Sequence, residues 1–318
     1  MTEQELLEFL ERSLKCSASS LIQGVGDDCA VVRQADRLLL LTVDAMVEGV
    51  HFDLAYFSPY SLGWKLAAAN LSDVAAMGGQ PLFGLLTLGL PSSPGKDFVE
   101  ELLMGITDAL QKYGACLVGG DSVKTERITL SLALTAEGEE GQVLFRKGAR
   151  TGDLIFVSRP LGASAMALEL LRQGLPVPEA LRQAHLMPEP EVTLGRTLAA
   201  KGLASAMIDV SDGLLLDLAR LCRASGVGAE IWEAKIPLFE ERVHGLSQPH
   251  LKYALEGGED WALLFTSPLE KKASLEALFR EMRRPLFEIG RCLSEKGLYL
   301  CRGGSRVRVA PKGFDHFA

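Results

Sequence analysis

The sequence predicts a protein of the α/β or α+β class that is divided into two domains. Apolar runs of strand length alternate with segments of helical periodicity in both halves of the chain. The length of 318 residues exceeds the roughly 250–300 residues at which a single core usually stops growing. With 47% apolar and 23% charged residues, the composition is that of a globular protein with material for two cores.

Elements of the first half are predicted from run length and side-chain type. The apolar run Arg37–Val43 is typical of a buried strand that ends at Asp44. The segment Ser61–Met77 is rich in small residues and too long for a strand, so it predicts a helix. A strand, a helix and two further strands complete this half, at Leu82–Leu90, Phe98–Tyr113, Ala115–Val118 and Ile128–Ala136.

A polar, glycine-containing segment at Arg146–Asp153 predicts the boundary between the domains. We expect an N-terminal domain over residues 1–148 and a C-terminal domain over residues 149–318. Beyond the boundary the alternation restarts, with a proline-containing loop at Met187–Pro190. The predicted elements there are strand Leu154–Ser158, helices Ala163–Gln173 and Val192–Lys201, strand Ala206–Val210, helix Gly213–Ser225 and strand Ala229–Ile231.

The net charge of −8 and the pI near 5.3 bear on the partners of this chain. A surface of this sign repels a phosphate backbone, so we expect no nucleic-acid partner. The same surface repels free ATP, and a chain of this charge that handles phosphates therefore needs bound cations. The longest apolar run, near Pro81–Leu90, is too short to span a bilayer, so no membrane partner is expected.

Cysteine spacing and the N-terminal pattern indicate a cytoplasmic protein. No two of the six cysteines form a C-x-x-C pair, so we expect neither a zinc site nor a disulfide framework. The N-terminus is acidic, unlike a secretory signal. It is followed by an amphipathic helix pattern with one apolar face, made of Leu6, Leu7, Leu10 and Leu14.

The most informative feature is a set of carboxylates in unusual settings, at least six of which leave apolar elements next to glycine. Its members are Asp27, Asp28, Asp44, Asp73, Asp121, Asp209, Asp212, Glu259 and Asp260. Single members have structural explanations: Asp212 could cap the helix that follows it, and Asp28 and Asp121 could be turn residues. Asp73 is different, because aspartate is a poor residue in a helix interior lined by small apolar neighbours. A buried carboxylate needs a partner or a metal, and Asn70, one turn earlier, could share that work.

Taken together, these carboxylates predict a magnesium site for a polyphosphate. Mg²⁺ is typically held by a few carboxylates and by substrate phosphates, and adjacent glycines let the backbone approach a phosphate. Familiar nucleotide motifs are absent. Gly95-Lys96 is preceded by Leu90 where a P-loop has its first glycine, and Gly24-Val25-Gly26 leads to Cys29 where a dinucleotide fingerprint has its third.

Nine segments carry a family resemblance that covers essentially the whole chain: Gly26–Asp28, Leu41–Asp44, Glu48–Phe52, Asn70–Asp73, Gly119–Asp121, Arg146–Arg150, Asp209–Gly213, Gly257–Asp260 and Pro311–Phe314. In this order they resemble the thiamine-monophosphate kinase family, within the superfamily of ATP-binding proteins similar to aminoimidazole-ribonucleotide synthetase. The acidic segments mark the superfamily. The segment Glu48–Phe52 and the closing Gly313-Phe314 point to the kinase family itself.

The resemblance implies a fold, a reaction and a set of site residues. It implies the two-domain fold of the superfamily, a homodimer formed through the N-terminal domains, and phosphorylation of thiamine monophosphate to thiamine diphosphate by ATP and several Mg²⁺ ions. The implied Mg²⁺ ligands are Asp28, Thr42, Val43, Asp44, Asp73, Asp121, Asp209 and Asp212. The implied ATP contacts are Gly120, Asp121, Arg146 and Ser211, and the implied substrate contacts are His51, Glu259 and Phe314. Catalytic roles fall to Asp44, Asp73, Asp121, Arg146 and Asp212.

The sequence departs from the family pattern at two positions, Val43 and Leu103. Relatives often carry a hydroxyl residue at Val43, so a metal contact there has to come from the backbone carbonyl. Leu103 stands where some relatives have a tyrosine beside the nucleotide, which removes that contact.

We expect direct in-line transfer, the last step in making thiamine diphosphate. The acceptor is a phosphate whose second pKa is about 6, so no strong general base is needed. Two other functions stay open. A related ATP-dependent synthetase of the superfamily would turn over a different acceptor. A non-catalytic binder of ATP or thiamine phosphates would bind both ligands without turnover.

Overall fold

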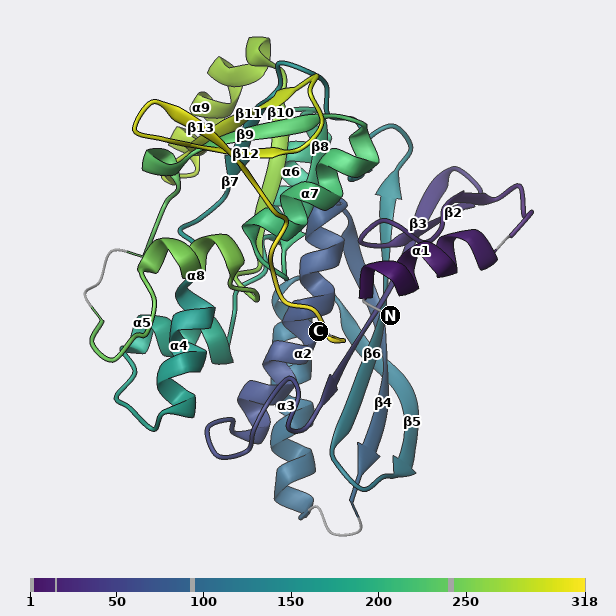
Figure 1. Cartoon of the computed structure of the whole chain (residues 1–318). Helices are drawn as coiled ribbons and strands as arrows, with labels where there is room; N and C mark the ends of the chain where they lie inside the picture. The colour runs from purple at the N-terminus through teal and green to yellow at the C-terminus, as the bar shows by residue number, and fades with distance from the viewer. Residues whose placement is uncertain (1–2, 15, 92–94, 240–242, 318) are drawn as a thin grey trace.

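The computed structural model describes residues 3–14, 16–91, 95–239 and 243–317. The first sheet has six strands, ordered β1 (Leu21–Gln23), β2 (Ala30–Gln34), β3 (Arg37–Val47), β6 (Thr129–Glu139), β4 (Gln80–Leu90) and β5 (Cys116–Lys124). Neighbouring strands are antiparallel except for the parallel pair β4–β5. Helices α2 (Pro59–Ala76) and α3 (Lys96–Lys112) lie along one face of this sheet (Figure 1), and α1 (Glu3–Ser13) precedes it.

The second sheet has seven strands, ordered β13 (Ser305–Val309), β12 (Leu298–Arg302), β9 (Gly228–Trp232), β11 (Phe287–Leu293), β7 (Leu154–Val157), β10 (Ala262–Ser267) and β8 (Ala206–Val210). Only the β9–β12 pair is parallel. The helices of this half are α4 (Ala163–Arg172), α5 (Glu179–Leu186), α6 (Val192–Ala200), α7 (Leu214–Ser225), α8 (His250–Glu256) and α9 (Lys272–Glu281), with short 3₁₀ turns η1 (Glu233–Lys235) and η2 (Leu269–Lys271).

Helix α2 is the central element of the molecule. It begins where the Ser58 hydroxyl accepts a hydrogen bond from the Ser61 backbone N–H, with Pro59 in the first turn, a typical helix start. Small residues then allow close packing on several sides: α2 contacts the first sheet, α3, α6 and β8. Nearly every α2 side chain is buried as a result, which is why a polar residue in this helix faces other polar residues or a cavity.

Two large apolar cores lie in the interior, and a small third one lies among α4, α5 and α8. The larger one extends from the first sheet through α2 and α3 to α6, α9 and one face of the second sheet. The other lies between the opposite face of the second sheet and α7. The C-terminal segment leaves the second sheet after β13 and runs back to α2 (Figure 1), where the Phe314 backbone N–H donates to the Asp212 carbonyl over 2.9 Å.

The predicted fold class is confirmed, and the mainly antiparallel pairing places it on the α+β side. Two predicted strands were too short. β3 continues to Val47, so Asp44 lies inside the strand and does not end it. β5 continues to Lys124, so Gly120 and Asp121 are strand residues as well. The sequence also missed β1, β2, α5, α8, α9 and β10 to β13.

Within the described ranges, no helix is both long and apolar enough to cross a membrane. All six cysteines are free thiols.

Candidate functional site

Three of the predicted carboxylates meet in space. Asp28 precedes β2, Asp73 lies on α2 and Asp209 lies on β8, and one carboxylate oxygen from each falls within 4.8 Å of the others. Asp28 and Asp209 are buried, and Asp28 Oδ2 has no hydrogen-bond partner among the described residues. A buried carboxylate oxygen without a partner is costly, so this geometry is suited to a cation.

Hydroxyl groups and an amide hold this carboxylate cluster in place. Thr42 donates a short hydrogen bond to Asp73, and the Ser72 hydroxyl donates to Asp209 over 2.6 Å. Asn70, which the sequence placed beside Asp73 as a co-ligand, instead accepts from the backbone N–H of Asp44 over 3.2 Å. Asn70 therefore fixes the strand that carries Asp44.

Burial and mutual repulsion raise the pKa values in this region. Burial is the main cause, and it raises the pKa of Asp44 to about 6, with the Asp212 charge adding to it. The pKa values of Asp73 and Asp209 are raised well above their usual range by burial and by neighbouring carboxylates. Groups in this state either take up protons or bind cations, and both relieve the same repulsion.

Two arginines balance part of the negative charge. Arg146 donates to Asp28 from Nη2 over 2.5 Å and from Nε over 3.2 Å, while Asp27 accepts from the Arg146 backbone N–H. Arg220 pairs with Asp212, and with Asp217 over 2.9 Å. The alternative that Asp212 caps α7 does not hold, because the cap residue is Gly213, and Asp217 accepts the backbone N–H groups of Asp212 and Gly213.

The predicted substrate residues line one cavity of about 760 Å³ together with part of the carboxylate set. His51, Glu259 and Phe314 come from three distant segments, and Ser211 also faces this cavity. The carboxylates in its wall are Asp44, Asp53, Asp73, Asp212 and Glu259. The size is that of a pocket for a small molecule. The fold thus places acidic and aromatic side chains around one space.

His51 is held as a neutral ring. Its Nδ1 accepts a hydrogen bond from the Val47 backbone N–H over 3.1 Å, which leaves the proton on Nε2. Burial lowers the His51 pKa, and the nearby His316 lowers it further. The His316 ring lies 5.0 Å from His51 and 4.7 Å from Phe314, measured between ring centroids, so the C-terminal segment forms part of the cavity wall.

The structure does not bring Gly120 and Asp121 to the carboxylate cluster within one chain. β5 lies three strands away from β3, a distance of about 14 Å at ordinary strand spacing. Asp121 is exposed and is paired in register with Thr87, whose side chain points away from the helices. The side chain of Val43 also faces that open side and is 64% exposed. The roles of these residues stay predictions.

Glycines beside the carboxylates have a packing reason. A Cβ atom on Gly120 would lie 1.8 Å from the Leu86 carbonyl oxygen, and one on Gly258 would lie 2.5 Å from the Ser211 carbonyl oxygen. Both contacts are with backbone atoms that cannot move aside. The sequence analysis assigned these glycines to close contact between the backbone and a phosphate. In the structure, the backbone at Gly120 and Gly258 is in close contact with another segment of the same chain.

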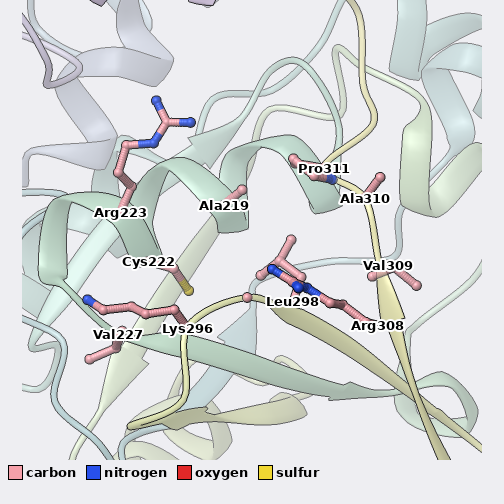
Figure 2. A pocket seen from close by; sticks show the side chains of 11 residues that line it. Ala219, Cys222, Arg223, Val227, Lys296, Leu298, Arg308, Val309, Ala310 and Pro311 are labelled. Carbon is pink, nitrogen blue, oxygen red and sulfur yellow. The ribbon is translucent and has the colours of Figure 1, made fainter.

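A second cavity, of about 610 Å³, lies between α7 and the β12–β13 hairpin and contains none of the predicted site residues (Figure 2). Its basic side chains do not converge: the guanidinium group of Arg223 points away from that of Arg308 (Figure 2). Lys296 donates to the Gly226 carbonyl at the end of α7. The candidate site is therefore the larger cavity.

Comparison with known proteins agrees with this geometry. The model of the AIR synthase related protein N-terminal domain matches residues 26–139, and that of the corresponding C-terminal domain matches residues 150–300. The thiamine-monophosphate kinase of Aquifex aeolicus is 36% identical, with 98% of this chain and 97% of that protein covered. The chain belongs to the thiamine-monophosphate kinase family.

Two further comparisons support membership of this kinase family. The thiamine-monophosphate kinase of Escherichia coli K12 is 37% identical, with 93% of this chain and 92% of that protein covered. The solved structure of AaThiL complexed with AMPPCP and TMP superposes with a TM-score of 0.87 at 36% identity. The superposition covers 99% of this chain and 97% of the other.

Sequence reasoning missed several residues of the kinase-family cavity. Arg172 at the end of α4 lines it, and so do Tyr56, Trp261 and His316. Lys65 lies behind Glu259, and the buried pair Asp217–Arg220 supports Asp212. Two of these left a signal in the sequence: Lys65 is the one basic residue of an apolar helix, and Asp217 and Arg220 are spaced for a helical ion pair.

Proposed function

We propose that this chain transfers the terminal phosphoryl group of ATP to thiamine monophosphate, giving ADP and thiamine diphosphate, the last step in making the diphosphate. Membership of the kinase family supports this reaction. The observation that carries it is one cavity lined both by carboxylates of the set, Asp44, Asp73 and Asp212, and by the substrate candidates His51, Glu259 and Phe314. ATP and thiamine monophosphate both carry phosphates, so their binding needs the carboxylates for metal ions as well as the substrate contacts.

The donor set fits Mg²⁺. Asp28, Asp73 and Asp209 offer converging carboxylate oxygens, and one oxygen of Asp28 lacks any partner in the described chain. Hard oxygen ligands of this kind suit magnesium. We assign these three residues, with Asp44 and Asp212 beside them, to several Mg²⁺ ions, and keep Thr42 and the Val43 carbonyl as further ligands. When bound, Mg²⁺ supplies the positive charge that lets two anionic phosphates approach each other.

The chain's own groups position the acceptor phosphate. His51 is neutral with its proton on Nε2, so it donates a hydrogen bond to a phosphate oxygen and does not act as a general acid. No strong base is required, because the acceptor oxygen is already ionised near neutral pH. Phe314 provides a ring face for the cationic thiazolium, an interaction of about 0.5–2 kcal/mol.

The donor side of the site is assigned to the two loops that carry Arg146 and Ser211. Arg146 is held by Asp28, close to the carboxylate cluster, where its charge can balance that of a nucleotide phosphate. Ser211 lines the cavity beside Asp212. Gly120 and Asp121 are kept as ATP and metal contacts on the strength of the family resemblance.

A homodimer formed through the first sheet is part of the proposal. The face of this sheet opposite α2 and α3 exposes a row of large apolar side chains: Leu41, Val43, Phe83, Leu85, Val118 and Val123. Monomeric proteins seldom expose a continuous apolar sheet face. A second copy on this face would also cover Asp121, which lies on the same side.

Two further assignments complete the proposal. We place the domain boundary between residues 148 and 149, because the first sheet ends at Glu139 and the second begins at Leu154. The cytoplasmic location predicted from the sequence is retained as a prediction.

The decisive experiment measures ADP release with Mg-ATP and thiamine monophosphate. Parallel reactions contain thiamine or an aminoimidazole ribonucleotide precursor as the acceptor, and the variant Asp44→Asn is the control. Turnover with thiamine monophosphate alone, lost in the variant, is the expected result. Turnover only with another acceptor would assign the chain to a sister synthetase, and binding of both ligands without turnover would make it a non-catalytic binder.

A further inference from the structure

Behind the candidate substrate residue Glu259 lies a lysine that no part of the proposed reaction uses. Lys65 is on α2, and its side chain is completely buried. Its Nζ lies 2.8 Å from Glu259 Oε2, a contact that joins positions 194 residues apart. Its Nζ also lies 5.2 Å from the centre of the Phe57 ring. Among the described residues, Glu259 is the only carboxylate that pairs with Lys65.

A fully buried lysine is expensive, so this one needs a reason. Burial lowers the pKa of Lys65, and the adjacent Glu259 carboxylate opposes that effect. An apolar side chain of similar size would fill the same space without the cost of burying a charge. We therefore expect the Lys65 charge to hold the Glu259 carboxylate in place, which an apolar side chain could not do.

Glu259 sits in a strained, tightly held loop. Its φ is +62° and that of Trp261 is +49°, both in the left-handed region that side chains other than glycine avoid. Backbone hydrogen bonds fix the loop: Glu259 N–H donates to the Ser211 carbonyl over 2.7 Å, and Trp261 N–H donates to the Val210 carbonyl over 3.0 Å. Strain of this kind is retained where a side chain has to point in one direction.

The contacts of Glu259 occupy only one of its two oxygens. Oε2 meets Lys65 and lies 3.4 Å from Nδ1 of His185, a buried ring that also contacts the Ser164 hydroxyl over 2.9 Å. Oε1 has no hydrogen bond to any part of the described chain. The Glu259 side chain is 28% exposed and lines the substrate cavity, so Oε1 is a free acceptor there.

We propose that Lys65 is a positioning residue for the acceptor substrate, holding Glu259 so that its second carboxylate oxygen accepts a hydrogen bond from an N–H donor of that substrate. The inference rests on the proposed function. Thiamine monophosphate has one such donor, the amino group on its pyrimidine ring. A site built to bond this group discriminates against an analogue that lacks it, because the acceptor is then left unpaired.

Binding without turnover tests the inference. Calorimetric titration of thiamine monophosphate in the absence of ATP compares the wild-type chain with Lys65→Met. We expect at least 10-fold weaker binding in Lys65→Met, with the affinity for a non-hydrolysable ATP analogue changed less than 3-fold. An analogue with a hydrogen atom in place of the pyrimidine amino group, which has no N–H donor, should bind both proteins equally. Lys112→Met, which removes an exposed ion pair with Glu189, is the matched control.

A double-variant cycle separates positioning from general damage. If Lys65 acts through Glu259, Lys65→Met/Glu259→Gln binds thiamine monophosphate no more weakly than Glu259→Gln alone. Independent, additive losses would overturn the inference, and so would wild-type affinity in Lys65→Met. If Lys65→Met does not fold, Lys65→Gln replaces it under the same criteria. Failure of the wild-type chain to bind thiamine monophosphate would instead refute the proposed function.

Discussion

At the scale of single residues, the site depends on buried and half-buried carboxylates that lie close together. Asp73 was the one member of the set that the sequence could not explain as a cap or a turn residue, and it lies against Asp28 and Asp209. The other carboxylates could be assigned to a metal site only because the structure places them close to one another. A lone carboxylate has many structural uses, whereas three converging ones repel each other unless a cation lies between them.

Asp73→Asn should abolish activity without unfolding the chain. The amide keeps the size and a hydrogen-bond partner for Thr42 but removes a charged ligand oxygen. We expect kcat to fall at least about 100-fold, the scale on which preorganised charge contributes to catalysis. Steady-state ADP release measures this, with Asp36→Asn in an exposed turn as the control. A fall of less than 3-fold would remove Asp73 from the site.

The raised pKa values predict how Mg²⁺ affects stability. The pKa of Asp44 is raised to about 6 by burial, so the folded state holds a proton that the unfolded chain releases near pH 4. The metal-free protein therefore loses stability as pH rises from about 4 to 6, with Asp73 and Asp209 acting in the same direction. We expect Mg²⁺ to bind the ionised carboxylates and to restore the stability that the metal-free protein loses.

Thermal unfolding with Mg²⁺ and with a chelator checks this expectation. At pH 7.5, Mg²⁺ should raise the unfolding temperature by several degrees, and at pH 5 the increase should be smaller because protons already occupy the carboxylates. An equal increase at both pH values would show that the metal binds elsewhere.

At the scale of elements, the contact between α2 and α3 depends on two glycines. A Cβ atom on Gly63 would lie 2.1 Å from the Leu102 carbonyl oxygen, and one on Gly105 would lie 2.0 Å from the Tyr60 carbonyl oxygen. The backbones of α2 and α3 are therefore in direct contact at these two glycines. The sequence predicted both helices, one from its small residues and the other from its periodicity, but neither signal reveals which helix faces which.

Gly105→Ala should destabilise the fold although alanine is the better helix former. The added methyl group has to push two backbones apart, and overpacking of this kind costs about 1–3 kcal/mol. Urea unfolding followed by circular dichroism measures the change. Gly95→Ala is the control, because a Cβ there meets no atom within 4 Å. Unchanged or greater stability in Gly105→Ala would contradict the close helix contact.

At the scale of the whole molecule, we expect the exposed apolar face of the first sheet to be covered by a second copy of the chain. Phe83, 53% exposed, lies on the face that carries the apolar row. Phe83→Glu should convert a dimer into a monomer, because it would bury a charge at the contact. Sedimentation velocity gives the mass of each form. Phe9→Glu on α1 is the matched control, since Phe9 is 55% exposed but belongs to a helix and not to the apolar row of the sheet. A wild-type monomer would refute the proposed dimer.

The fold class, most elements of the first half, fewer than half of those in the second half and the carboxylates of the candidate site could be predicted from the sequence alone. These follow from local chemistry, because apolar runs, periodicity and an aspartate in a small-residue helix can each be read without knowing their neighbours. Strand ends were less certain: β3 and β5 continue through Asp44 and Asp121, since pairing with an adjacent strand extends a segment beyond its apolar run.

Only the tertiary structure decided which of these residues work together. It joined Lys65 to Glu259, assigned Asn70 to the backbone of Asp44, and left Asp121 on the open side of the first sheet. Contacts between residues far apart in the chain depend on which faces of helices and sheets pack together. That choice is made by the complementarity of whole surfaces, which no single segment of the sequence contains.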